Sequence, residues 1–420
     1  MAGFAAIMMA FGAVTFALPG NAATQEASVA GQIIVKFRDK GAAAGILRQH
    51  GLSQGPGVGS TGAQLVKVPA GKELRLIETL GRNRAVEYAE PDELVTAAGT
   101  DQYFDRQYGL ENHGQPFTNT AGTVTMPVGA PDADIDATEA WGLARGSGVR
   151  VAIIDSGVAI NHDDISPQVV DRVNLSDSVI RADHPEDYDK YGHGTHVAGI
   201  VAAIPGNSIG VAGVCPECDI LDVKVLNDNG SGLSSGIAKG IDWAVGHGAK
   251  VINMSLGQRV SSRTLEAAVN NAWAAGVVIV AAAGNAGTQA QIYPGAYPKV
   301  IAVAATDNKD VRASFSSYGK WVDVAAPGVN VYSTFPMGGF VLGDQNHRSP
   351  GYDIESGTSM ASPVVAAVAA LTWSTAAGIS NESVRKKVES TAENITGTGS
   401  SWKYGRVNAY RAVGGADPGV

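Results

Sequence analysis

The segment Val151-Ala152-Ile153-Ile154-Asp155-Ser156-Gly157 decides the class of fold. Four consecutive apolar residues that end in a Ser-Gly turn are typical of a β-strand buried on both faces. A carboxylate follows at the point where this strand ends. Ligands of open α/β sheets bind at the carboxyl ends of the strands, so Asp155 is a candidate functional residue. Taken alone, a polar residue that closes the strand in a turn is the simpler interpretation.

Apolar segments and helical patterns alternate along the chain on both sides of this strand. We expect strands at 220–226, 251–256, 277–282, 300–304 and 321–325, and helices at 195–203, 235–246 and 265–275. This alternation predicts an α/β fold, a doubly wound parallel sheet with helices on both faces. Residues 364–373 are apolar on all sides and predict a buried helix.

The composition suits a compact, turn-rich enzyme. The 420 residues are 45% hydrophobic, and a prior of about 150 residues per domain allows two or three domains. The 17% of charged residues falls below the usual share of about 25%. The net charge is −9 and no cluster of Lys or Arg occurs in the sequence, which argues against a nucleic-acid partner.

The N-terminal region predicts an exported precursor. An uncharged apolar run, residues 4–18, is followed by Pro19-Gly20 and small residues, which indicates a signal peptide over residues 1–23. The run is too short for a comfortable membrane span, so we expect secretion, extracellular or periplasmic, without stable membrane insertion. No Lys or Arg precedes the run, a departure from the signal-peptide pattern that an upstream start would explain. The alternative to export is an N-terminal anchor.

Two smaller units precede the large α/β domain. Strand patterns at 32–37, 63–68 and 85–88, with helical patterns at 42–50 and 73–80, predict a small α+β unit over residues 30–98. Residues 99–138 are polar and contain Gly, Asn, Thr and Pro, as is typical of a linker and docking segment. The large domain takes residues 139–420.

The only cysteines are Cys215 and Cys218, in Cys-Pro-Glu-Cys. One pair at this spacing suits either a small disulfide loop formed after export or two buried thiols. A zinc site would need a second pair, which the sequence lacks.

Two further motifs place reactive side chains at helix starts. In Gly192-His193-Gly194-Thr195-His196 the two histidines are three residues apart, whereas a zincin needs them four apart with a glutamate between. We therefore expect His196 to be buried and structural. Ser359 opens the buried helix, where its N–H would stabilise a developing negative charge. Alone, Ser359 is equally explained as a helix N-cap.

Together the motifs resemble those of the subtilase family. Asp-Ser-Gly, His-Gly-Thr-His-Val-Ala-Gly and Gly-Thr-Ser-Met-Ala-Ser-Pro occur in that family's known chain order, and the likeness runs from about Asp132 to Ala409. Residues 34–37 and 86–92 resemble its inhibitory propeptide. The resemblance implies a monomeric serine endopeptidase that cleaves polypeptides. It also implies a ferredoxin-like propeptide, residues 30–98, that acts as intramolecular chaperone and inhibitor until the enzyme removes it.

The resemblance also implies the catalytic roles. Ser359 is the nucleophile, His193 the base that takes its proton, and Asp155 the residue that orients the imidazole. Asn285, at the end of the predicted strand 277–282, matches the side-chain donor of the oxyanion hole. The alternative is a catalytically inactive binding or inhibitory module of the same fold. An α/β-hydrolase esterase would need a Gly-x-Ser-x-Gly elbow with Asp and His after the serine, and that order is absent.

The resemblance implies that substrate binds as an added strand. The residues expected to contact it are Gly230, Ser231, Gly232, Ser255, Leu256, Gly257, Ala282, Ala283, Gly284 and Ile292. Many family members carry glycine where this chain has Ile292. The branched side chain therefore implies a shallow pocket that prefers small or medium apolar residues before the scissile bond.

A structural Ca²⁺ is the implied cofactor. Its expected ligands are Asp164, Asn207, Ile209 and Val211, with a weaker cation site at Asp323. Asp183, Asp187 and Asp189 form an acidic cluster that suits either calcium or a solvated loop, the latter being the simpler interpretation. Residues 335–355 are longer than in compact family members and are expected to border the leaving-group side of the cleft.

Overall fold

The computed structural model describes residues 28–39, 41–59, 61–69, 71–93, 101–179, 188–375 and 380–416. The chain divides into two compact units, Met1–Ala97 and Ala98–Val420. The expected signal peptide and the junction near Ala98 lie outside the described residues.

The first unit is a small α+β domain, as the sequence predicts. Its elements run β1 (Ser28–Phe37), α1 (Ala43–Gln49), β2 (Ala63–Lys67), α2 (Glu73–Gly81) and β3 (Val86–Glu93). Among its described residues, three antiparallel strands form the sheet, in the order β2-β1-β3. Ile33, Val35 and Phe37 alternate along β1 and are buried with Leu47 and Leu80 in one core.

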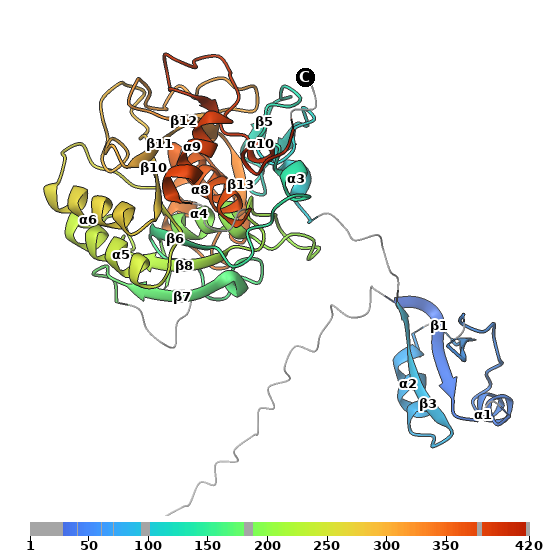
Figure 1. The fold of residues 1–420 in the computed structure, drawn as a ribbon. Helices are drawn as coiled ribbons and strands as arrows, with labels where there is room; N and C mark the ends of the chain where they lie inside the picture. The colour runs from blue at the N-terminus through green and yellow to red at the C-terminus, as the bar shows by residue number, and fades with distance from the viewer. Residues whose placement is uncertain are drawn as a thin grey trace, which may run out of the picture. The chain divides into compact units, whose positions relative to one another are not determined.

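The second unit is built on a parallel sheet of eight described strands (Figure 1). The order is β15-β12-β11-β10-β9-β6-β8-β7, and every pairing in it is parallel. The strands are β6 (Arg150–Asp155), β7 (Val169–Asn174), β8 (Asp219–Lys224), β9 (Val251–Met254), β10 (Val278–Ala282), β11 (Val300–Thr306), β12 (Val324–Pro327) and β15 (Gly405–Arg406).

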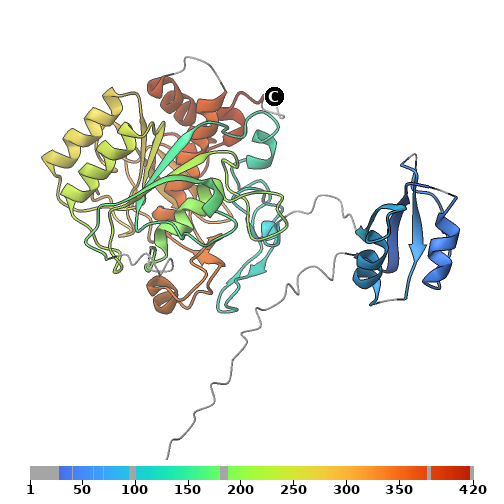
Figure 2. The same cartoon turned by 90° about the horizontal axis from the view of Figure 1, so that it is seen from below.

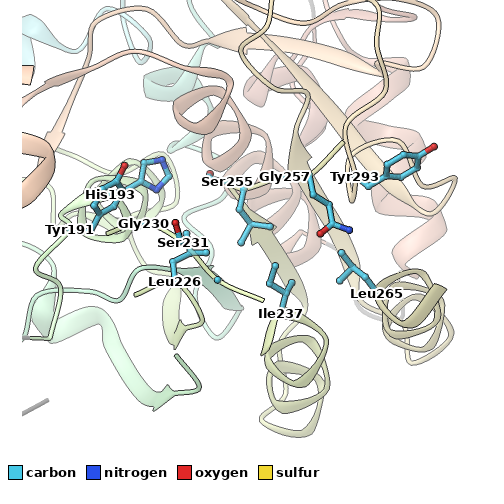
Figure 3. A pocket seen from close by; sticks show the side chains of 13 residues that line it. Tyr191, His193, Leu226, Gly230, Ser231, Ile237, Ser255, Gly257, Leu265 and Tyr293 are labelled. Atoms are coloured by element: carbon cyan, nitrogen blue, oxygen red, sulfur yellow. The ribbon is translucent and has the colours of Figure 1, made fainter. Parts of the chain in front are cut away.

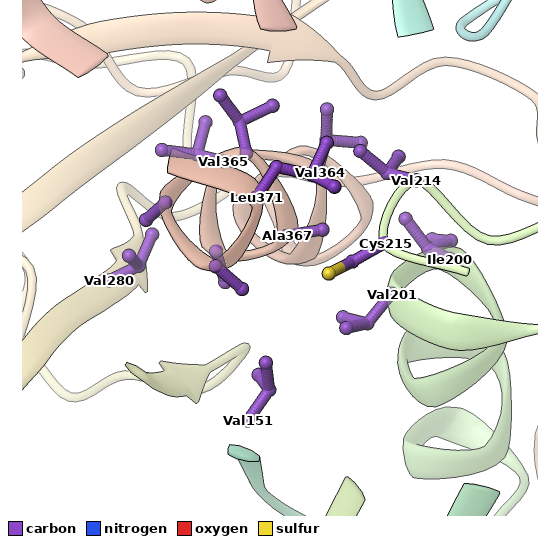
Figure 4. Packing of buried hydrophobic residues seen from close by; sticks show 14 of the residues in the cluster. Val151, Ile200, Val201, Val214, Cys215, Val280, Val364, Val365, Ala367 and Leu371 are labelled. Carbon is purple, nitrogen blue, oxygen red and sulfur yellow. The ribbon is translucent and has the colours of Figure 1, made fainter. Parts of the chain in front are cut away.

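Successive residues of each central strand enter two different cores. In β6, Val151 and Ile153 join the core that contains α4 (His193–Ala202) and α8 (Thr358–Ser374). Ala152 and Ile154 join the core that contains α5 (Ser234–Gly246) and α6 (Arg263–Ala274). Figure 2 shows the sheet between these two helix layers, and Figure 4 shows Val151 and Val280 facing α8. Each buried Val or Leu contributes about 1.5–3 kcal/mol.

Shorter elements complete the described part of this unit. They are η2 (Phe104–Arg106), β4 (Phe117–Thr118), β5 (Thr125–Met126), α3 (Ala137–Ala140), η3 (Ser166–Gln168), β13 (Val331–Thr334), α7 (Val341–Asn346), β14 (Tyr352–Glu355), α9 (Asn381–Ser390) and α10 (Ala409–Ala412). β13 and β14 pair antiparallel, and α7 lies between them in the chain.

The order of the strands reverses next to β6. Chain connections run from β6 toward β8 on one side and then toward β9 and β10 on the other. Such a switch point leaves a crevice at the carboxyl end of the strands. Asp155 is the last residue of β6 and therefore stands at this crevice.

Cys215 and Cys218 are joined in a disulfide, which resolves the two interpretations of this pair. Both are buried against the core that contains α4 and α8. No helix in the described ranges is long and apolar enough to cross a membrane.

Candidate active site

Asp155 and His193 are held together at the crevice. Asp155 ends β6, and His193 is the first residue of α4. The Nδ1 atom of His193 lies 2.7 Å from Oδ1 of Asp155, whose side chain is fully buried. Burial lowers the pKa of His193, but the charge and hydrogen bond of Asp155, with the charges of Asp189 and Glu355, together raise it above its ordinary value.

A second buried carboxylate, Asp189, fixes the backbone around this pair. It accepts hydrogen bonds from the Ser156 hydroxyl (2.8 Å), the Gly192 N–H (2.9 Å), and the N–H (2.9 Å) and hydroxyl (2.5 Å) of Thr195. Ser156 follows Asp155, and Gly192 and Thr195 flank His193. Asp189 therefore ties the end of β6 to the start of α4. Asp189 is buried rather than solvated, and Asp183 and Asp187 lie outside the described residues.

Ser359 stands in the first turn of α8, where backbone N–H groups have no partner within the helix. Pro363 lies four residues later and has no N–H to give the Ser359 carbonyl. The Ser255 hydroxyl donates to that carbonyl instead, at 2.7 Å. The Ser359 hydroxyl in turn donates to the Ser255 carbonyl at 3.2 Å. Strand β9 and helix α8 are thus joined at the serine.

Asn285 follows β10 and faces the start of α8. Its Oδ1 accepts hydrogen bonds from the N–H and the hydroxyl of Thr358, each at 2.9 Å. Thr358 is in turn fixed by the Gly284 N–H, which donates to its hydroxyl at 2.9 Å. These bonds hold the amide so that Nδ2 is the atom left to donate toward the crevice. Within the described residues Nδ2 has no hydrogen-bond acceptor.

Two adjoining cavities follow the crevice, and together they contain nearly all the expected substrate contacts. One, of about 380 Å³, is lined by His193, Tyr191 and the two expected substrate-binding segments, residues 230–232 and 255–257 (Figure 3). The other, of about 550 Å³, is lined by Ser359, Asn285, Ala282, Gly284 and Ile292, among others. Ala283 does not line either cavity. It is buried in a separate core with Trp402.

Ile292 lies across the second cavity, between two glycines. A Cβ atom placed on Gly257 would come within 2.4 Å of Ile292 Cγ2, and one on Gly284 within 2.9 Å of Cγ1. The side chain therefore fills space between the two walls of this cavity.

Asp164, Asn207 and Val211 gather at one loop, together with Asp101, which the sequence analysis missed. Asp164 accepts hydrogen bonds from Asn207 Nδ2 (2.7 Å) and the Val211 N–H (3.0 Å). Asp101 accepts from the Asn207 N–H at 3.1 Å. Burial raises the pKa of Asp164 to about 6 and also raises that of Asp101. The Ile209 N–H bonds the Asn207 side chain at 2.9 Å and so belongs to the same loop.

Asp323 does not fit the cation site expected there. Its Oδ1 lies 2.6 Å from Lys403 Nζ and 3.5 Å from Arg385 Nη2, and its Oδ2 accepts from the Ala302 N–H at 2.9 Å. Two cationic side chains already neutralise this carboxylate. No group of three or more His, Cys, Asp or Glu side chains suited to a metal occurs in the part of the chain that the structure describes.

His196 is buried, as expected from the sequence. Burial lowers its pKa to about 3, and its ring packs against Phe335. It is therefore neutral and takes no part in proton transfer.

Comparison with known proteins identifies relatives across most of the chain. The model of the subtilase family matches residues 146–407, and that of the fervidolysin N-terminal prodomain matches residues 19–92. Thermitase from Thermoactinomyces vulgaris is 48% identical over 66% of this chain and 93% of its own. A thermophilic serine proteinase from Bacillus sp. strain AK1 is 40% identical over 92% of this chain and 88% of its own.

A solved structure agrees with this assignment. A protease from Pseudoalteromonas arctica superposes with a TM-score of 0.63 at 32% sequence identity. The match covers 76% of this chain and 99% of that protein.

We predict that Asp189→Asn destabilises the fold. All four partners of Asp189 are hydrogen-bond donors, so the NH₂ group of an asparagine would face donors and find no acceptor. A buried donor without a partner costs about 1–3 kcal/mol. Urea denaturation of the purified protein measures this loss. Asp163→Asn, at an exposed position, is the matched control. Equal denaturation midpoints for the two variants would show that Asp189 does not stabilise the contact between the end of β6 and the start of α4.

Proposed function

The chain belongs to the subtilase family of serine endopeptidases, and we propose that its chemistry runs through Asp155, His193 and Ser359. The observation that carries the proposal is the 2.7 Å hydrogen bond between buried Asp155 and His193, at the edge where Ser359 opens α8. A serine hydroxyl is a weak nucleophile until a base takes its proton. The hydrogen bond to Asp155 gives His193 the tautomer and basicity for that task.

The reaction proceeds in two halves. Ser359 Oγ leaves the Ser255 carbonyl, attacks the carbonyl carbon of the scissile peptide bond, and passes its proton to Nε2 of His193. The tetrahedral intermediate then collapses, the C–N bond breaks, and His193 returns the proton to the leaving amine. Water repeats the sequence on the acyl-enzyme and releases the acid.

The oxyanion of each intermediate is stabilised by Asn285 Nδ2 and by the Ser359 N–H. Thr358 holds the amide of Asn285 through two hydrogen bonds, so this donor is oriented before substrate arrives. Donors fixed in advance need no reorganisation when charge develops, and this is where electrostatic catalysis gains most.

The enzyme is made as a precursor with an N-terminal prodomain, and we infer that residues 30–98 inhibit it until self-cleavage near Ala98–Gly99. Residues 1–23 would direct export and residues 99–138 would dock on the catalytic domain, residues 139–420. The support is the apolar run and the family resemblance of segments 34–37 and 86–92. We therefore propose an exported enzyme that acts on polypeptides as a monomer.

We predict that Ser359→Ala is exported but keeps its prodomain. Without the nucleophile the precursor cannot cut itself, and a serine-directed fluorophosphonate will not label it. N-terminal sequencing and gel-based labelling of purified protein measure both effects, with Ser400→Ala, at an exposed serine, as the control. If purified Ser359→Ala matures alone, self-processing is wrong. If wild type resists the phosphonate, the protein is an inactive module of this fold.

We propose that the pocket for the residue before the scissile bond prefers small or medium apolar side chains. Its lining includes Ser255, Leu256, Gly257, Ala282 and Gly284, which offer no carboxylate for Lys or Arg. Ile292 takes up room between its walls. Forcing an aromatic ring into the remaining space costs about 1–3 kcal/mol.

We predict that Ile292→Gly raises kcat/KM for Phe substrates by about tenfold relative to Ala substrates, as relief of about 1.4 kcal/mol implies. Paired peptide substrates that differ only at this residue give the ratio. Val311→Gly, at an exposed position, controls for a general effect of the substitution. The assignment fails if wild type already prefers Phe over Ala by a large factor.

We further propose a structural Ca²⁺ held by Asp164, Asn207 and the backbone carbonyls of Ile209 and Val211, with Asp101 added. The donor set fits, because Ca²⁺ prefers carboxylate, amide and carbonyl oxygens. The buried carboxylates of Asp101 and Asp164 repel each other and have raised pKa values, which a cation between them would reverse.

We predict that Ca²⁺ raises the melting temperature more at pH 7 than at pH 4.5. The pKa of Asp164 is about 6 in the folded state, above its unfolded value. The native state therefore binds the proton more tightly, and stability without cation falls as pH rises from about 4 to about 6. Ionised Asp164 binds Ca²⁺, and saturation at a hundred times Kd adds about 2.7 kcal/mol.

The measurement is thermal unfolding of phosphonate-inhibited enzyme in chelator or CaCl₂, with MgCl₂ as the ion control. Asp164→Ala should blunt the effect, whereas Asp163→Ala, at the exposed neighbouring position, should not. Identical melting curves with chelator and with CaCl₂ at pH 7 would rule out this site.

A further inference from the structure

The segment between β13 and β14 packs against the loop that leads into His193 and α4. The Val341 N–H donates to the Lys190 carbonyl at 2.8 Å, and the Leu342 N–H donates to the Tyr191 carbonyl at 3.1 Å. These two bonds fasten the start of α7 to the residues that lead into α4. Tyr191 also packs against the apolar cluster of Phe335, Phe340 and Leu342.

The ring of Phe340 covers the backbone directly before His193. A Cβ atom placed on Gly192 would lie 2.3 Å from the Phe340 ring, so the ring occupies the space that a side chain there would need. Gly192 has a φ of +94°, a left-handed conformation that other residues rarely adopt. Gly192 is the N-cap of α4, so its peptide leads directly into His193.

Phe335 braces Phe340 from behind. The two rings are stacked with centroids 4.6 Å apart, and Phe335 also lies 4.6 Å from the ring of His196. Phe335 is fully buried and Phe340 is 3% exposed. The aromatic stack therefore contacts α4 on both sides of His193 in sequence, at Gly192 and at His196.

Two hydroxyls of β13 fix the same helical turn. Ser333 Oγ donates to the His196 carbonyl and Thr334 Oγ1 to the Thr195 carbonyl, each at 2.8 Å. Asp189 binds the N–H groups of this turn, as described above. The turn is thus bound through its N–H groups by Asp189 and through its carbonyls by β13, and Phe340 closes the remaining side at Gly192.

We propose that Phe340, braced by Phe335, is a positioning residue for catalysis that fixes the direction of the His193 imidazole. This inference rests on the proposed role of His193 as the base. Proton transfer needs the imidazole aligned with both Asp155 and the Ser359 hydroxyl. Loss of the ring would let the Gly192 peptide move, and a misplacement of about 1 Å in a catalytic group costs on the order of 100-fold in rate.

The test compares Phe340→Ala with Phe104→Ala, which removes a partly buried ring that packs against Trp141 and the core cluster of α4 and α8. Phe340→Ala should lower kcat by about 10- to 100-fold while KM changes by less than about twofold. The rate of fluorophosphonate labelling should fall by the same factor, because it needs the base but not the leaving-group subsites. Phe104→Ala should lower the melting temperature and leave kcat near wild type.

A second readout separates positioning from stability. Asp155 raises the pKa of His193, so a looser Asp155–His193 bond should move the acid limb of the kcat/KM profile to lower pH. Phe340→Leu keeps only part of the apolar cover over Gly192, so its kcat and its acid limb should lie between those of Phe340→Ala and wild type. If Phe340→Ala does not fold, the test rests on Phe340→Leu, which should show a lower kcat and an acid limb moved to lower pH.

The proposal is overturned if Phe340→Ala and Phe104→Ala have the same kcat and the same acid limb below their melting temperatures. It is equally overturned if Phe340→Leu folds and matches wild type while Phe340→Ala is lost only through unfolding. Failure of the proposed function would look different, because wild type itself would then resist the phosphonate.

Discussion

The central strand β6 is buried on both faces and has room for a charged side chain only where it ends. Alternate residues of β6 enter the cores on its two sides, so a charged side chain within this strand would be desolvated without a partner. Asp155, the last residue of β6, is the first position at which a carboxylate can meet donors. Helices α4 and α8 begin at the same edge and supply those donors and the serine. The position of the site follows from this constraint.

The buried charges at this edge are stabilised by hydrogen-bond donors, although Oδ2 of Asp155 has no partner among the described residues. Asp189 accepts four hydrogen bonds, and Asp155 accepts from the Ser156 N–H at 2.7 Å as well as from His193. The same reasoning explains Ser255, whose hydroxyl replaces the N–H that Pro363 cannot supply. Hydrogen bonds are stronger in a low dielectric, so this network makes the backbone around Asp155, His193 and Ser359 rigid.

The sequence predicts those features that depend on local pattern. The central strands, the two helix layers and the disulfide-compatible cysteines were evident, because apolar runs and motif spacing are local. Strand β7 was missed, since its residues 169–174 are mostly half-buried or exposed and show no apolar run. Helix α9 was missed because its charged surface leaves only Asn381, Val384 and Val388 buried. The roles of Asp101, Asp189 and Asp323 depend on partners far along the chain, and composition near an aspartate does not reveal them.

The least predictable part of the site consists of contacts made at glycines. Phe340 occupies the space of the missing side chain at Gly192, and Ile292 does so at Gly257 and Gly284. In both cases the bulky partner lies far away in sequence or on another element, so neither the glycine nor the apolar residue is informative alone. One contact lies behind His193, the proposed base, and the other lies in the proposed substrate pocket. Because interiors are close-packed, such a pair transmits a change in either partner directly to the backbone that it covers. On the proposed function, specificity and alignment therefore depend on residues that carry no reactive group.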